Sequence, residues 1–242
     1  MRTLHLLDLT LSSPAENLAL DEALLDELDE CGGVPVLRFW ESDHHFVVLG
    51  ASCRPVDDVH LTACKQDGVP VLRRASGGGT VLQGPGCLSY AFVLPLRLDP
   101  RLGNIRSTNQ FILKRIASAL HRWEPATAFR GISDLAIGEM KISGNAQRRT
   151  RQALLFHGTI LYGMPAEIIA RYLKQPARRP DYRRDRSHES FLRTIEAPPE
   201  AIKLAIADVW STGSTLDVWP EARLQHKVLA VIRRTADVPA PV

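Results

Sequence analysis

A run of three glycines, Gly77, Gly78 and Gly79, constrains the fold of this chain more than any other feature of the sequence. The run follows a strand-like segment, 69–73. Three glycines in a row cost so much backbone entropy that the fold must need them there. A backbone without Cβ atoms can approach a ligand closely and present its N–H groups to an anion. Arg73 and Arg74 directly precede the loop and could hold a phosphate or a carboxylate through paired hydrogen bonds.

The loop by itself does not identify a ligand. No Gly-Lys-Ser/Thr follows it and it does not match G-x-G-x-x-G, so neither common nucleotide-binding pattern applies. A glycine-rich hairpin turn flanked by solvated arginines would account for the same residues. The loop alone leaves both interpretations open.

Helix and strand signals around the loop do not alternate strictly. A serine N-cap at Ser13, a proline at the first helical position and Glu16 at the capping-box position predict a helix that ends near Gly32. Strands are predicted at 34–40, 46–49, 69–73, 88–94 and 154–162, a hairpin at 135–143, and helices at 107–122, 165–173, 199–210 and 220–234. This order favours an α+β fold, with a mixed β-sheet flanked by helices. No internal repeat or linker interrupts it, so a single domain over 1–242 is predicted.

Composition excludes several classes of protein. A net charge of +3 over 242 residues is too small to indicate nucleic-acid binding, although it permits a locally basic surface for an acidic protein partner. No apolar run reaches membrane-spanning length, and Asp8 interrupts the N-terminal apolar run too early for a secretion signal. The cysteines, at positions 31, 53, 64 and 87, form no C-x-x-C pair. We therefore expect a cytoplasmic protein with reduced thiols and no structural zinc.

A second segment places a lysine beside small polar residues. Lys141 lies between Met140 and Ile142 just after a tight turn, so its side chain faces away from those apolar neighbours. It points either to solvent or into a polar cleft, and Ser143 and Gly144 would leave room there for a ligand. Further along, His157 lies on a predicted core strand, where a hydrogen-bonded core histidine is favoured over a general base.

Together these segments resemble a known family. Residues 73–81 resemble the R-R-x-S-G-G-G-x-V signature of lipoate–protein ligase A. Asp134 with 141–147 resembles that family's D-L-…-K-x-S-G-x-A-x block, and 157–161 its H-G-T-L-L block. Residues 17–25 and 37–40 are similar to its N-terminal pattern. The resemblance covers about 14–195, which leaves 196–242 as C-terminal helices and tail. It implies the biotin/lipoate ligase catalytic domain, related to class II aminoacyl-tRNA synthetases.

The resemblance implies that ATP and Mg²⁺, the ion arriving with the nucleotide, activate lipoate or octanoate as an acyl adenylate. The acyl group is then transferred to a lysine of an apo lipoyl domain or of a glycine-cleavage H-type carrier protein. The resemblance assigns Lys141 to contacting both the acyl carbonyl and the phosphate. The residues it assigns to adenylate binding are Arg73, Ser76, Gly77, Gly78, Gly79, Asp134, Ser143 and Gly144. Charge developing on the phosphate needs such donors, and the mixed anhydride then reacts with an amine without a protein nucleophile.

Two departures from the family pattern matter. Larger members carry a C-terminal accessory domain that this chain is too short to include, so we expect a separate partner protein to supply it. In addition, residues 83–87 replace the H-D-x-G-N sequence of better-known ligases and place Cys87 near the presumed site.

Cys87 defines the first alternative function. Octanoyl or lipoyl transferases of the same superfamily pair a nucleophilic cysteine with the equivalent of Lys141 and need no ATP. No cysteine occurs in 134–161, so Cys87 is the candidate, although a small buried apolar role is favoured for it. A non-catalytic lipoate-binding protein is the third possibility, and the intact Lys141 and glycine loop argue against it.

A basic run follows the lysine segment. Its members are Lys174, Arg178, Arg179, Arg183, Arg184 and Arg186. We predict an exposed connector, which is either simply solvated or a surface that steers an acidic carrier toward the site. Under the second interpretation, Arg183 and Arg184 bind the carrier.

Overall fold

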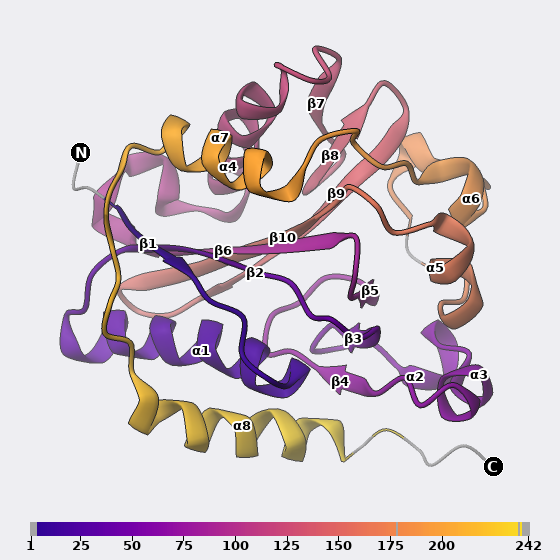
Figure 1. The fold of residues 1–242 in the computed structure, drawn as a ribbon, viewed down its shortest axis with the longest axis horizontal. Coiled ribbons are helices and arrows are strands. Elements are labelled where there is room, and N and C mark those ends of the chain that lie inside the picture. Colours follow the sequence, from indigo (N-terminus) through magenta and orange to yellow (C-terminus); the bar gives the residue numbers. More distant parts are fainter. Residues whose placement is uncertain (1–3, 178, 237, 239–242) are drawn as a thin grey trace.

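A mixed eight-stranded sheet forms the centre of the molecule (Figure 1). The computed structural model describes residues 4–177, 179–236 and 238. The order across the sheet is β11-β1-β2-β6-β10-β9-β8-β7; β1 pairs in parallel with β2 and β11, and every other pair is antiparallel. The strands are β1 (Leu4–Asp8), β2 (Val36–Trp40), β6 (Cys87–Pro95), β7 (Thr127–Arg130), β8 (Asp134–Ile137), β9 (Met140–Arg149), β10 (Ala153–Leu161) and β11 (Thr212–Thr215).

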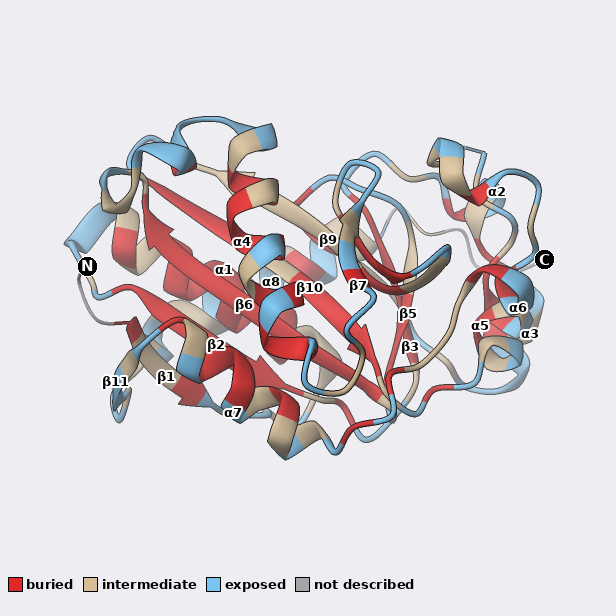
Figure 2. Cartoon of the chain, turned by 90° about the horizontal axis from the view of Figure 1, so that it is seen from above, coloured by how far each residue is buried: buried red, intermediate tan, exposed pale blue. Residues whose placement is uncertain are grey.

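Helices cover both faces of this sheet, and the alternation of side chains along its strands explains why. Tyr90 and Phe92 of β6 pack in a cluster with α4 (Ile105–Leu120) and α7 (Pro199–Val209). Ala91 and Val93, which point to the opposite face, pack against α1 (Pro14–Cys31). On that side α8 (Glu221–Thr235) lies along α1 (Figure 1). The central strands β6 and β10, between these layers, are almost entirely buried (Figure 2).

A buried ion pair fixes α1 to the sheet. The Arg38 side chain on β2 is fully buried and lies 2.6 Å from Asp21 on α1. It also donates to the Asn17 side chain and main chain, at 2.7 and 2.8 Å. Breaking such a pair by removing one partner typically costs about 3–5 kcal/mol, so these polar residues of the N-terminal pattern are needed for the fold.

A second, three-stranded sheet extends one end of the molecule and carries the glycine loop (Figure 1). In its order β4-β3-β5, β3 (Phe46–Leu49) is central, with β4 (Val71–Arg73) parallel and β5 (Val81–Gln83) antiparallel to it. The loop joins β4 to β5. Near this end lie α2 (Pro55–Asp58), α3 (Leu61–Gln66), α5 (Ala166–Tyr172) and α6 (His188–Phe191), while the 3₁₀ turns are η1 (Leu96–Leu98), η2 (Pro100–Gly103) and η3 (Asp181–Arg183).

The predicted fold class is confirmed, as are the main predicted helices and the strands of the sheet's centre. The Ser13 capping box is formed on both sides, and Gly32 closes α1 in the left-handed conformation. The sequence did not indicate β1, β5, β7 or β11. Among the described residues, no helix is long and apolar enough to cross a membrane.

Candidate functional site

Arg74 lies inside the glycine loop and determines its shape. Its Nη2 donates to the carbonyls of Gly77 and Gly79, at 2.7 and 2.8 Å. Its Nε donates to Ser76 Oγ at 3.0 Å. Burial lowers the pKa of Arg74 to about 10, which still leaves it protonated at neutral pH. The loop is therefore wrapped around an internal cation, and Arg74 is not available for a ligand.

This wrapping turns loop amides outward. Because a trans peptide sets C=O and N–H on opposite sides, the carbonyls of Gly77 and Gly79 that point at Arg74 direct the N–H groups of Gly78 and Thr80 away from it. Within the described residues, these two amides donate to no protein acceptor. The three glycines are exposed. Outward N–H groups on an exposed loop are the donors that an anion would need at this segment.

Arg73 is attached to backbone carbonyls. Its Nη1 donates to Cys53 O at 2.8 Å and to Gly50 O at 3.1 Å, and its Nε donates to Arg234 O at 3.2 Å. Neither Arg73 nor Arg74 is therefore placed to form the predicted paired hydrogen bonds with an anion. Both arginines instead hold the backbone that would meet the anion.

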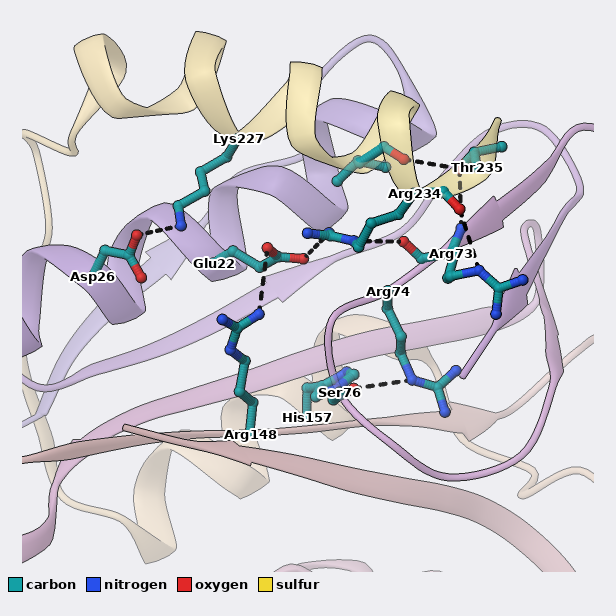
Figure 3. Close-up of polar contacts among 11 residues, drawn as sticks. Glu22, Asp26, Arg73, Arg74, Ser76, Arg148, His157, Lys227, Arg234 and Thr235 are labelled. Carbon is teal, nitrogen blue, oxygen red and sulfur yellow. Dashed lines mark hydrogen bonds and ion pairs between the residues drawn. The ribbon is translucent and has the colours of Figure 1, made fainter. Parts of the chain in front are cut away.

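The loop rests on β9 and β10 of the large sheet. Ser76 Oγ lies 2.6 Å from His157 Nε2 on β10 (Figure 3). A Cβ at Gly78 would lie 3.4 Å from the Ala146 Cβ on β9. Burial, and secondarily the charge of Arg74, lower the pKa of His157 to about 3. His157 is therefore neutral, and because Ser76 already accepts from Arg74, its hydroxyl is free to donate to the ring nitrogen. This fits the hydrogen-bonded core histidine that was favoured.

Lys141 shares that face of β9. Its Nζ lies 2.8 Å from Asp134 Oδ1, and a Cβ added at Gly144 would lie 3.0 Å from the same Nζ. Gly144 and Ala146 are two residues apart on one strand and so point to the same side. The fold thereby brings the Lys141 ammonium and the glycine loop to adjacent positions on one surface. Gly79 and Lys141 are 62 residues apart in the sequence.

Tyr182 is a site residue that the sequence did not reveal. Its hydroxyl donates to Asp134 Oδ2 at 2.8 Å, so the carboxylate that pairs with Lys141 is held from both sides. Burial and the neighbouring Asp134 charge raise the pKa of Tyr182 far above its ordinary value, which keeps the hydroxyl protonated. The signal available in the sequence was an aromatic residue inside the basic run.

Ser143 supports this arrangement from the buried side. Its side chain is almost fully buried, and Ser143 Oγ accepts a hydrogen bond from Asn145 Nδ2 at 3.0 Å. Asn145 also bonds to the Ser133 carbonyl at 2.8 Å and to the Tyr90 hydroxyl. A Cβ at Gly158 would overlap the Asn145 side chain, which explains a glycine at that position. Ser143 is placed to brace the strand, whereas Gly144 is placed beside Lys141.

Cys87 lies in the core. Its side chain is 1% exposed and packs with Leu82, Leu161 and Met164. Burial raises the pKa of this thiol to about 12, so it carries no appreciable thiolate at neutral pH. The thiol beside the loop is Cys53, whose Sγ donates to Gly78 O at 3.4 Å. No pattern in the sequence indicates Cys53, which lies outside both motifs.

The prediction that 174–186 is exposed throughout is wrong at Arg183. That side chain is buried, donates to Gln175 Oε1 at 2.7 Å and stacks on the Phe191 ring at 4.8 Å. It holds the segment together and cannot meet a carrier. Arg184 is exposed, and Arg178 lies outside the described residues. No group of three His, Cys, Asp or Glu side chains that could hold a metal occurs in the part of the chain that the structure describes.

Several known proteins resemble this chain in sequence. The family model described as "Lipoyl protein ligase A/B catalytic domain" matches residues 13–203. A protein of Aeropyrum pernix, provisionally named lipoate-protein ligase A, is 29% identical over 219 residues, which is 90% of this chain and 75% of the relative. The octanoyltransferase LipM of an Exiguobacterium species is 29% identical over 190 residues, covering 69% of this chain and 68% of the relative. Two Mycoplasma relatives are longer, and the chain spans 46% of each.

Solved structures show the same fold. A crystal structure of lipoate-protein ligase A bound with ATP has a TM-score of 0.78 at 21% identity, covering 96% of this chain and 94% of that one. A bi-partite lipoate protein ligase of Thermoplasma acidophilum, studied with its E2 lipoyl domain, has a TM-score of 0.77 at 21% identity, covering 96% and 93%.

Proposed function

The chain belongs to the lipoyl protein ligase A/B catalytic-domain family, and from that premise we propose that it is an ATP-dependent lipoate–protein ligase. It activates lipoate or octanoate as an acyl adenylate and transfers the acyl group to a lysine of a carrier protein. We propose that the chain acts as one catalytic domain in the cytoplasm. The matched family contains both ligases and octanoyltransferases, so the choice between them depends on the site.

The observation that carries the proposal is the glycine loop and Lys141 on one face of β9. In the first step, the acyl carboxylate attacks the α-phosphate of ATP and pyrophosphate leaves. The outward amides of Gly78 and Thr80 can donate to the phosphate oxygens as negative charge develops there. The Lys141 ammonium offsets the charge that the carboxylate brings.

In the second step, the acceptor lysine's amine attacks the acyl carbonyl of the mixed anhydride. AMP leaves as the amide forms, and the amine proton passes to the departing phosphate or to solvent. Lys141 stabilises the carbonyl oxygen as it becomes negative. Asp134, itself held by Tyr182, keeps the ammonium in position, so little order has to be created when the substrates arrive.

The second candidate is an octanoyl or lipoyl transferase that needs no ATP, and it is favoured by the similarity to LipM. That reaction requires a thiolate that attacks a thioester. The burial of Cys87 and its raised pKa do not support it as the nucleophile. A ligase needs no protein nucleophile, so an inert Cys87 fits the first candidate.

We propose that Mg²⁺ arrives with ATP, bound largely by the phosphates of the nucleotide. The carrier is an apo lipoyl domain, as with the Thermoplasma ligase and its E2 lipoyl domain, or an H-type protein. We propose that a separate accessory protein raises this activity without being required for it, and we propose no role for nucleic acid or a membrane.

The decisive experiment supplies the purified protein with lipoate, ATP and an apo lipoyl domain, and follows lipoyl-AMP and the lipoylated domain by mass spectrometry. We expect both products, and neither without ATP. Cys87→Ser should retain this activity, since the thiol is only a core residue. Transfer from octanoyl-carrier protein without ATP, together with an acyl adduct on Cys87, would establish the second candidate instead. Lipoate binding without either product would leave the non-catalytic alternative.

A further inference from the structure

A helix from the other end of the chain, α8, forms hydrogen bonds with the end of the edge strand β4. The Arg73 amide donates to Thr235 Oγ1 of α8 at 3.2 Å. In return, Arg234 Nε lies 3.4 Å from Arg73 O, while Arg73 Nε donates to Arg234 O at 3.2 Å (Figure 3). Both main-chain groups of the last residue of β4 are thus bonded to the last turn of α8. The glycine loop begins at the next residue.

The last turn of α8 is itself fixed to α1. Arg234 Nη2 lies 2.5 Å from Glu22 Oε1, and the Glu22 side chain is 6% exposed. Arg148 of β9 approaches the other carboxylate oxygen at 3.9 Å (Figure 3). A carboxylate buried this deeply needs its cation, so Arg234 is held in one position.

A short series of contacts leads from Arg73 to the loop carbonyls. The Arg73 guanidinium donates to Cys53 O, and Cys53 Sγ donates to Gly78 O. The Gly78 carbonyl also occupies the space where a Cβ on Gly50 would stand. A displacement of Arg73 would therefore shift the carbonyl of Gly78, and with it the peptide planes that turn the loop amides outward.

We propose that the last turn of α8 positions the glycine loop for the nucleotide, with Arg234 as the positioning residue. The inference rests on the proposed function, because it names what holds the proposed phosphate-binding loop in place. Arg234 touches no reacting atom in this scheme. It fixes Arg73, which fixes the backbone that meets the phosphate.

Lys227 provides a matched control. It lies on the same helix and forms an ion pair with Asp26 on the same partner helix, α1, and among the described residues it forms no hydrogen bond or ion pair with β4 (Figure 3). Arg234→Ala and Lys227→Ala each remove one ion pair between α8 and α1, and Arg234→Ala should cost more stability because Glu22 is the more buried carboxylate. Only Arg234→Ala should raise the KM for ATP in adenylate formation, by about tenfold or more, with a smaller change in kcat. Arg234→Lys, which can keep the pair with Glu22, should recover part of the loss.

A second measurement needs no activity. Cys53 reports on the loop, whereas Cys31 accepts a hydrogen bond from Arg223 Nη2 at 3.0 Å and reports on the start of α8. Alkylation followed by peptide mass spectrometry should show faster labelling of Cys53 in Arg234→Ala, with Cys31 unchanged. Faster labelling of both would mean that the whole helix detaches, which contradicts a specific role.

The two proposals fail in distinguishable ways. If the wild type forms no adenylate, the ligase assignment fails while the labelling experiment still tests the contact between α8 and the loop. If the wild type forms adenylate but Arg234→Ala matches Lys227→Ala in KM and in Cys53 labelling, the positioning role is wrong. Should Arg234→Ala not fold, Thr235→Val removes only the hydroxyl that accepts from Arg73 and is judged by the same two readouts.

Discussion

At the scale of single residues, Lys141 depends on partners that its sequence neighbours do not reveal. Its ammonium is paired with Asp134, which Tyr182 anchors from the basic segment. The glycine at 144 gives it room. A solvated lysine would need none of these. Its ordered position is the reason to expect a large and specific loss when the ammonium is removed.

We predict that Lys141→Ala lowers acyl transfer by about 10²–10³-fold, which corresponds to about 2.7–4 kcal/mol for the loss of one donor to developing charge. The protein should still fold, because Asp134 keeps the Tyr182 hydrogen bond. Single-turnover formation of lipoyl-AMP and of the lipoylated domain is the measurement. Lys174→Ala is the control, since the ammonium of that lysine donates to the Val56 carbonyl and not to a residue of the site. Near-normal turnover in folded Lys141→Ala would remove Lys141 from the mechanism.

His157 should make the free energy of unfolding depend on pH, in a direction that its lowered pKa determines. Its pKa is about 3 in the folded protein and near its ordinary 6.5 in the unfolded chain, so the unfolded state binds more protons between these values. Its contribution to stability is complete above about pH 6.5 and declines as pH falls toward 3, by at most about 1.4 kcal/mol per pH unit.

The difference in unfolding free energy between wild type and His157→Gln, measured by urea denaturation across pH 4–8, should therefore shrink at the acid end. Gln can still accept from Ser76 but does not titrate there. A difference that stays constant with pH would show that His157 is not held neutral.

The sequence was informative about some site residues and uninformative about others, for physical reasons. The glycines and Lys141 lie in motifs, because backbone freedom and a placed charge are local requirements. Arg74's inward direction and the approach of Cys53 depend on how β4 packs against β3, which no local pattern encodes. For Cys87 the sequence was misleading. We predicted it near the site because it is close to a motif in the sequence, but its side chain points into the core.

At the scale of elements, the glycine loop offers two neighbouring glycines whose substitution should have different effects. Gly78 has φ +89°, and a Cβ there would lie 3.0 Å from Arg74 Nη2. Gly77 has no positive φ, and its Cβ would meet nothing within 4 Å. The two neighbours therefore differ in how much the fold needs them to be glycine.

We predict that Gly78→Val costs about 1–3 kcal/mol of stability through backbone strain and abolishes binding of a non-hydrolysable lipoyl-adenylate analogue. Gly77→Ala should keep wild-type stability and lose less affinity. Isothermal calorimetry and thermal unfolding of both variants make the comparison. Unchanged affinity in folded Gly78→Val would mean that the loop has only a structural role.

Elements with strong local signals were predicted, and elements that owe their existence to neighbours were not. The capping box and amphipathic pattern of α1 are local. By contrast, β11 is a mostly exposed Thr-Gly-Ser-Thr segment that becomes a strand because β1 offers it a free edge. Strand β5 has only three residues and is defined by its pairing with β3. Tertiary context decides such cases.

At the scale of the whole molecule, the remaining question is where a carrier protein would approach. The net charge of +3 is too small for long-range attraction of the whole protein, so any steering must be local. The segment beside the site is basic, and Tyr182 connects it directly to Asp134 and thus to Lys141. Of its arginines, Arg183 is buried and Arg186 is bonded to main-chain carbonyls, whereas Arg184 is exposed.

We therefore predict that Arg184→Glu raises the KM for an acidic carrier about fivefold at low salt, with a smaller effect at high salt because screening weakens exposed charges. Lipoyl-AMP formation should be unchanged, since the carrier takes no part in it. Residue 184 has φ +54° in the wild type, and glutamate has the same backbone limits as arginine, so no new strain is introduced. Arg97→Glu makes the same charge change just beyond the far end of β6 and should leave the KM unaltered. If the two variants have equal KM values at low ionic strength, the basic segment is a solvated surface and the carrier docks elsewhere.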